Sequence, residues 1–201
     1  MSASEIRSLA RALLDLCKMR KLTIATAESC TGGLVCASLV DIPGSSAVVT
    51  TGFITYSNEA KHELLGVSAE TLETFGAVSK EAAVSMATGA LTKAKADLTV
   101  AVTGIAGPGG ATPGKPVGLV HLAVAARDGR IISREKRFGA IGRTPVRMRS
   151  VVEALKMLTE LARGPAKVKL KRPAPGAGRL RPRVSRTLRQ SAGTRRRTSR
   201  P

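Results

Sequence analysis

The stretch Thr26-Ala27-Glu28-Ser29-Cys30-Thr31-Gly32-Gly33 decides the expected fold of this chain. It lies between two apolar runs, residues 22–25 and 34–40, an order typical of a strand, a tight turn and the start of a helix. We expect a helix over residues 33–40, whose first turn would offer unpaired backbone N–H groups and partial positive charge. Such a helix start suits a phosphate or an oxyanion, although many Gly-Gly turns serve only packing.

Outward from this stretch, β-branched runs and helical spacings of apolar residues alternate along the chain. Strands are expected at residues 22–26, 47–56, 98–102, 117–126 and 131–138. Helices are expected from a Ser2 cap to Arg20, at residues 33–40, 59–65, 69–74 and 80–96 with Ser79 as N-cap, and from a Thr144 N-cap onward. This order predicts an α/β fold, a three-layer α/β/α sandwich with a mixed, mostly parallel sheet of about five strands.

Composition divides the 201 residues into two parts. Residues 1–163 hold 20 Lys and Arg and all 14 Asp and Glu, a net charge of +6, whereas residues 164–201 hold 13 Lys and Arg and no acid. We therefore predict one domain over residues 1–163 and a basic, Pro/Arg-rich disordered tail over residues 164–201. The tail could serve an anionic partner, be a solvated extension, or be translated past the natural end of the domain.

Cysteine and histidine usage excludes several classes of protein. The cysteines Cys17, Cys30 and Cys36 are odd in number and lack CxxC spacing, which favours reduced thiols in the cytoplasm. His62 and His121 have no carboxylate or cysteine at ligand spacing, so we expect no metal site. No organic cofactor is expected either. The chain begins without a signal-peptide pattern and has no apolar run long enough for a membrane span.

Hydroxyl and amine side chains gather at the expected strand ends. Ser29 follows one strand and Thr103-Gly104 follows another, while Tyr56 ends a third and Lys61 lies in the helix after it. In an open α/β sheet, ligands bind outside the carboxyl ends of parallel strands, so these residues would converge there. A rim with Ser, Tyr, Lys and Thr favours acyl transfer by a hydroxyl nucleophile with lysine as the base.

Several separate motifs in this chain, found in the expected order, resemble the C-terminal domain of the competence/damage-inducible CinA family. They are TAESCTGG (26–33), GSS (44–46), GFITYSNEAK (52–61), GAVS (76–79), TGIAGPGG (103–110) and KPVG (115–118). The resemblance covers residues 4–162 and leaves out the tail. It implies a nicotinamide-nucleotide amidohydrolase, which converts nicotinamide mononucleotide and water to nicotinate mononucleotide and ammonia in pyridine nucleotide salvage.

The resemblance also implies functional residues, to which the expected helix start adds Thr31, Gly32 and Gly33 and the expected strand end adds Gly104. The expected catalytic residues are Ser29, Ser46, Tyr56 and Lys61, and the expected substrate-binding residues are Thr31, Gly32, Gly33, Thr103, Gly104 and Arg143. Residues 140–143, Ala-Ile-Gly-Arg, depart from the pattern, which more often has Gly-Asp-Arg. The acid that would orient Arg143 is thus missing.

Each of these residues also has an ordinary structural interpretation. Ser29 could cap a helix, Ser46 could be a turn residue, and Lys61 could be a solvated surface charge. Tyr56 could be strand packing, and Arg143 could be a surface arginine beside Arg147 and Arg149. The sequence does not decide between Ser29 and Ser46 as the nucleophile.

Two other functions compete with the amidohydrolase. The domain could hold a nucleotide without turnover, or the chain could bind nucleic acid through its tail. Expected partners are nicotinamide mononucleotide as substrate, further copies of the chain in a homo-oligomer, and polyanions at the tail, with no membrane.

The charge of the tail predicts salt-sensitive binding to polyanions. Because 13 uncompensated basic residues release counterions on contact, the affinity of the full chain for duplex DNA should fall steeply with salt. Fluorescence anisotropy at several salt concentrations, on the full chain and on residues 1–163, measures this. Equal affinities of the two proteins would refute a role of the tail in polyanion binding.

Overall fold

The computed structural model describes residues 3–164, so the expected Ser2 cap and the tail beyond Gly164 lie outside the described part. The helices are α1 (Ala3–Arg20), α2 (Leu34–Val40), α3 (Asn58–Leu65), α4 (Ala69–Thr74), α5 (Lys80–Ala94) and α6 (Arg143–Arg163), with a short 3-10 helix η1 (Ser45–Ala47). The strands are β1 (Ile24–Glu28), β2 (Val49–Ile54), β3 (Leu98–Gly104), β4 (Leu119–Ala126) and β5 (Ile131–Arg137).

One mixed sheet with the strand order β2-β1-β3-β4-β5 organises the domain. β1 pairs in parallel with β2 and β3, while β4 is antiparallel to β3 and to β5. Four of the five strands therefore run in the same direction, which confirms the expected mixed, mostly parallel sheet. In register, Glu28 at the end of β1 lies between Ile54 of β2 and Val102 of β3, so three strands end at one edge.

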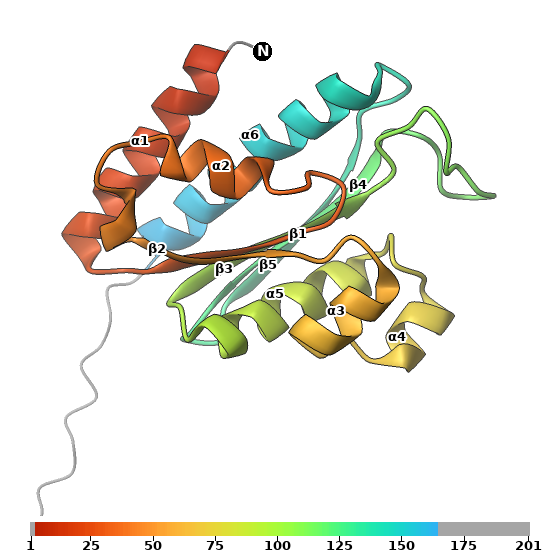
Figure 1. The fold of residues 1–201 in the computed structure, drawn as a ribbon, viewed down its shortest axis with the longest axis horizontal. Helices are drawn as coiled ribbons and strands as arrows, with labels where there is room; N and C mark the ends of the chain where they lie inside the picture. Colours follow the sequence, from red (N-terminus) through yellow and green to blue (C-terminus); the bar gives the residue numbers. More distant parts are fainter. Residues whose placement is uncertain (1–2, 165–201) are drawn as a thin grey trace, which may run out of the picture. The chain divides into compact units, whose positions relative to one another are not determined.

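Helices cover both faces of this sheet, as Figure 1 shows: α1, α2 and α6 on one face and α3, α4 and α5 on the other. The face under α1, α2 and α6 buries large aliphatic side chains such as Ile24, Val100 and Leu122. The face under α5 buries alanines, among them Ala27, Ala101 and Ala123, against the alanines of α5. Because these side chains are small, α5 can lie close to the sheet.

The boundaries of the helices and strands lie within two residues of those expected from the sequence. The strand expected at residues 98–102 continues to Gly104. The expected Thr144 N-cap is wrong, because α6 begins at Arg143 and its N-cap Gly142 makes no side-chain hydrogen bond to the helix. Ser79 does cap α5, since its hydroxyl accepts a hydrogen bond from the Ala82 N–H at 3.1 Å.

Within residues 3–164, no helix combines the length and the apolar character that a membrane crossing requires.

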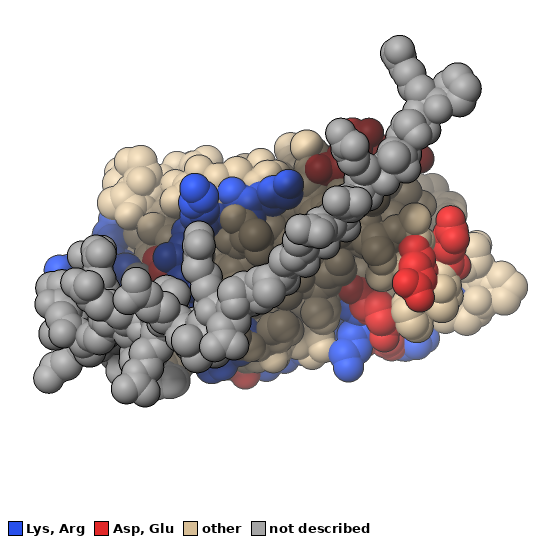
Figure 2. All heavy atoms as spheres, turned by 90° about the horizontal axis from the view of Figure 1, so that it is seen from below, with Lys and Arg blue, Asp and Glu red and all other residues tan. Residues whose placement is uncertain are grey.

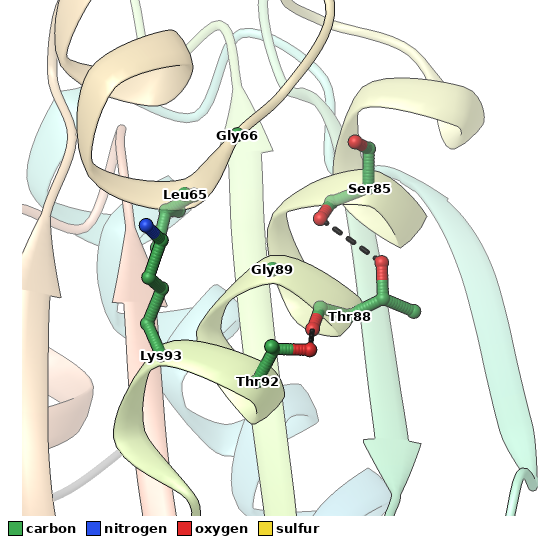
Figure 3. A pocket seen from close by; sticks show the side chains of 7 residues that line it. All are labelled: Leu65, Gly66, Ser85, Thr88, Gly89, Thr92 and Lys93. Atoms are coloured by element: carbon green, nitrogen blue, oxygen red, sulfur yellow. Dashed lines mark hydrogen bonds between the residues drawn. The ribbon is translucent and has the colours of Figure 1, made fainter.

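Gly89 allows α3 and α5 to approach each other. A Cβ built on Gly89 would lie 1.9 Å from the backbone oxygen of Leu65, at the end of α3. Figure 3 shows this junction, with Gly89 on α5 beneath Leu65 and Gly66, beside a surface hollow of about 280 Å³. The glycine is therefore required by packing rather than by its backbone angles.

Substitution of Gly89 by alanine should destabilise the domain. Helix propensity alone would favour alanine by about 1 kcal/mol, but the overlap with Leu65 forces α3 away from α5 at a cost of about 1–3 kcal/mol beyond that gain. Urea unfolding followed by far-UV circular dichroism measures the difference. Gly109→Ala is the control, because no atom lies within 4 Å of its added Cβ. A Gly89→Ala protein as stable as the wild type would contradict this account of the junction.

Candidate active site

Ser29 lies at the carboxyl edge of the sheet, where β1, β2 and β3 end together. Its backbone N–H donates to the Val102 oxygen at 2.9 Å, and the Thr55 N–H donates to the Glu28 oxygen at 2.8 Å. The first bond extends the β1–β3 pairing by one residue, and the second extends the β1–β2 pairing by one residue. The expected convergence of strand ends is thus confirmed, and Ser29 lies in the middle of it.

Lys61 extends from α3 to this edge and is 1% exposed. Its Nζ donates to the backbone oxygens of Thr55 at 3.0 Å, Ser57 at 3.2 Å and Tyr56 at 3.3 Å. The same Nζ donates to Ser29 Oγ at 3.3 Å, and Ser29 itself is 8% exposed. The structure thus brings Ser29 and Lys61 into direct contact, and the interpretation of Lys61 as a solvated surface charge is wrong.

Opposing effects act on the protonation of Lys61. Burial lowers the pKa of its amine, while the carboxylate of Glu59 opposes this shift. The three carbonyl oxygens accept hydrogen bonds only, so they favour the ammonium. The Ser29 hydroxyl can accept from the ammonium or donate to the lone pair of a neutral amine. Both protonation states therefore have hydrogen-bond partners here, as proton transfer requires.

The start of α2 is not free to bind an anion, so the expectation of unpaired N–H groups there is wrong. The carboxylate of Glu28, which is fully buried, accepts from the N–H groups of Gly33 at 3.0 Å, Val35 at 3.0 Å and Cys36 at 2.8 Å. The Glu28 carboxylate therefore already binds the N–H groups that a phosphate or an oxyanion would need. Ser29 therefore does not cap α2, and its hydroxyl meets Lys61 instead.

Thr31, Gly32 and Gly33 form the turn between β1 and α2. Gly32 and Gly33 have φ values of 58° and 93°, which explains two consecutive glycines. Thr31 is fully buried, and its Oγ1 has no hydrogen-bond partner within residues 3–164. Contact of these three residues with a substrate stays a prediction.

Arg143 and Tyr56 meet at the rim of the same edge. One guanidinium nitrogen of Arg143 donates to the Tyr56 hydroxyl at 3.1 Å, and the other donates to the Gly107 oxygen at 3.1 Å. The Tyr56 side chain is on the surface, with 62% of the residue exposed, so it does not pack within the sheet. The structure thus brings together residues that lie 87 positions apart.

Arg147 holds the turn after Ser29 and is not the ordinary surface arginine that the sequence suggests. Its Nε donates to the Cys30 oxygen at 3.1 Å, and its Nη2 donates to the Thr31 oxygen at 2.7 Å. Arg147 follows Arg143 by four residues on α6, and this spacing puts both on one face of a helix. That spacing was the available signal in the sequence.

Thr103 and Gly104 lie beside Ser29 but also serve packing. The Thr103 hydroxyl is buried and donates to the Ala77 oxygen at 2.7 Å, which ties the segment before α5 to the sheet. A Cβ on Gly104 would lie 2.7 Å from the Leu119 oxygen, so no larger residue fits. Contact of either residue with a ligand stays a prediction.

Ser46 is not brought to this edge. It is exposed in η1, before the first residue of β2, whereas Thr55 follows the last. Since β2 has six residues at about 3.3 Å each, Ser46 lies roughly 20 Å from Ser29 within one chain. The structure therefore separates the two candidate nucleophiles, and only Ser29 contacts Lys61.

Other features of the described surface lie away from this edge. One hollow is lined by Leu91, Thr92, Lys95 and Arg127, and the hollow of Figure 3 lies on the outer side of α5. Neither includes Ser29 or Lys61. Between residues 3 and 164, no three His, Cys, Asp or Glu side chains come together as a metal site.

Known proteins resemble this chain in sequence and in fold. The family model of the CinA C-terminal domain matches residues 6–162. A nicotinamide-nucleotide amidohydrolase PncC of Enterobacter agglomerans is 45% identical over 155 residues, which are 77% of this chain and 94% of the relative. A CinA-like protein of Mycolicibacterium gilvum is 51% identical over 142 residues, 71% of this chain, and the match spans only 33% of that longer relative.

Among solved structures, the competence/damage inducible protein CihA of Agrobacterium tumefaciens has the same fold. It superimposes with a TM-score of 0.77 at 54% sequence identity, covering 78% of this chain and 95% of that chain. This similarity extends the sequence match to the arrangement of the strands and helices.

The cysteine next to Ser29 should be unreactive. Burial is the main cause that raises the pKa of Cys30 to about 12, so its thiol stays protonated at pH 8. We expect iodoacetamide at pH 8 to leave Cys30 unmodified in the folded protein and to modify it after denaturation, as measured by peptide mass spectrometry. Rapid alkylation of Cys30 in the folded protein would instead make it a rival nucleophile.

Proposed function

Because this chain belongs to the CinA C-terminal domain family, we propose that it is a nicotinamide-nucleotide amidohydrolase. The substrate would be nicotinamide mononucleotide, and the products nicotinate mononucleotide and ammonia. The observation that carries the proposal is the buried contact of 3.3 Å between Lys61 Nζ and Ser29 Oγ at the edge where three strands end. The named activity of the Enterobacter agglomerans relative supports it. A homo-oligomer that acts in cytoplasmic pyridine nucleotide salvage is part of the same proposal.

Acylation is the first half of the proposed reaction. Ser29 Oγ attacks the carboxamide carbon while neutral Lys61 takes the hydroxyl proton. The C–N bond of the tetrahedral intermediate then breaks, and Lys61 returns the proton to the departing nitrogen, so that ammonia leaves. An ester between Ser29 and the nicotinoyl group remains.

Hydrolysis of this ester is the second half. Water attacks the ester carbon while Lys61 accepts a proton from it, and Ser29 leaves as the alcohol after taking that proton back. The product acid and the free enzyme are formed with no change in oxidation state. Lys61 acts as base and then as acid in each half, which requires an amine with partners in both protonation states.

The charge distribution around the edge favours one orientation of the substrate. Acidic side chains gather over α3 and α4, as Figure 2 shows from that side, and they include Glu59, Glu63, Glu70 and Glu73. The exposed Arg143 lies on the α6 side, while the guanidinium of Arg147 is already occupied by the Cys30 and Thr31 oxygens. We propose that the phosphate of the substrate lies toward α6. There the exposed guanidinium of Arg143 would release the Gly107 oxygen and the Tyr56 hydroxyl and bind two phosphate oxygens instead.

Substitutions at Ser29 and Lys61 test this function. Ser29→Ala, Lys61→Met and Lys61→Arg should each lower the kcat of ammonia release from nicotinamide mononucleotide by about a hundredfold or more, since general-base catalysis contributes ~10²–10⁴. Arginine keeps the charge but cannot give up its proton. Ser46→Ala is the matched control, and we expect it to keep wild-type turnover.

Three results would contradict the proposal. Near-wild-type turnover of Lys61→Arg would make Lys61 a binding residue, and near-wild-type turnover of Ser29→Ala would favour direct attack by water. Binding of nicotinamide mononucleotide without any release of ammonia by the wild type would instead indicate a nucleotide-binding domain without turnover.

A further inference from the structure

The turn that carries Ser29 is held from two sides by side chains that the reaction does not use. Glu28 binds the end of the turn and the start of α2, and Arg147 binds its middle from α6. The Ser29 backbone is tied to β3 by its N–H, which donates to the Val102 oxygen at 2.9 Å, and to the turn by its oxygen, which accepts from the Gly32 N–H at 3.0 Å. The position of the Ser29 hydroxyl therefore depends on how rigidly residues 30–33 are held.

Glu28 cannot act on a substrate bound at Ser29. Successive side chains of a strand point to opposite faces, and Ala27 lies in the core under α5, so Glu28 points toward α2. Both of its carboxylate oxygens accept hydrogen bonds there, one from two N–H groups and one from a third. The carboxylate is fully buried, so its contacts are fixed.

Arg147 holds two successive carbonyl oxygens of the same turn. Its Nε binds the Cys30 oxygen and its Nη2 binds the Thr31 oxygen, at 3.1 Å and 2.7 Å. A planar guanidinium can bind both oxygens at once in one geometry, whereas a single ammonium cannot do so with the same precision. The guanidinium of Arg147 therefore sets the orientation of the peptide groups that follow Ser29.

We propose that Glu28 and Arg147 are positioning residues that together hold the Ser29 hydroxyl within hydrogen-bond distance of Lys61. The kinetic test of this inference rests on the proposed function, because its readout is the release of ammonia. A displacement of about 1 Å between reacting groups can cost about a hundredfold in rate, so loss of either contact lowers kcat while the substrate site stays largely intact.

Two variants and two matched controls test this proposal. Glu28→Gln keeps the size of the side chain but puts an amide NH₂ against backbone N–H donors, and Arg147→Met keeps an unbranched stem without the fork. Asp97→Asn is the control for the first, because Asp97 is also a buried carboxylate that accepts from the Thr23 N–H and hydroxyl, and it lies at the opposite end of β3. Arg149→Met is the control for the second, since Arg149 is exposed on the same helix.

The kinetic readout is the separation of kcat from KM for ammonia release. Glu28→Gln and Arg147→Met should lower kcat about tenfold or more with KM within about threefold of the wild type, and both controls should keep kcat within about twofold. Far-UV circular dichroism gives the folded fraction of each protein, which suits a chain without tryptophan. Unchanged kcat in Glu28→Gln and Arg147→Met, or equal losses in the controls, would overturn the proposal.

A crystal structure of Arg147→Met tests the same point without turnover. Compared with a crystal structure of the wild type, the distance from Ser29 Oγ to Lys61 Nζ, 3.3 Å here, should lengthen by about 1 Å in the variant, the displacement on which the kinetic argument depends. An unchanged distance would overturn the positioning role. If the wild type does not release ammonia, the proposed function fails while this distance still decides the inference.

Discussion

The site depends on the burial of one amine, that of Lys61. An amine removed from water must find hydrogen-bond partners within the protein, because an unsatisfied buried donor is costly. The backbone between β2 and α3 supplies them, as three successive carbonyl oxygens at residues 55–57 accept from Nζ. The remaining neighbour is Ser29. The need to satisfy the three N–H donors of Lys61 is therefore met by the path of the chain after β2, and Ser29 is a fourth neighbour, through the contact on which the proposed chemistry depends.

The two faces of the sheet carry different parts of the site. Ala27, Glu28 and Ser29 are consecutive, so Ser29 points to the side of α3 and α5, and Glu28 points to the side of α2. The alanine-rich face lets α5 lie close, and Gly89 lets the end of α3 approach α5. On the other face, Glu28 and α6 hold the turn after β1. Ser29 thus faces the side of the sheet where Lys61 lies, while the adjacent Glu28 stabilises the turn from the other side.

Local patterns in the sequence predict the helices and strands well, because neighbouring residues determine where these elements begin and end. Apolar runs indicate β1 and β3, Ser79 indicates the start of α5, and the convergence of strand ends follows from the parallel order. The Glu28 cap was missed because its carboxylate reaches N–H groups five to eight residues ahead, beyond the usual capping pattern. On sequence alone Ser46 is an equal candidate for the nucleophile, because the sequence does not show that η1 lies at the other end of β2. The burial of Lys61 depends on the path of the whole segment before it, which no spacing in the sequence encodes.

The central claim is that Lys61 works as a base, and its own titration tests this most directly. The ¹³Cε resonance of Lys61, followed by NMR in protein with labelled lysine and assigned with Lys61→Met, reports the protonation of this amine. The account predicts a pKa below the ordinary value of about 10.4, at the same pH as the acidic limb of the kcat/KM profile. A Lys61 that stays protonated throughout the pH range in which kcat/KM is already maximal would contradict the account.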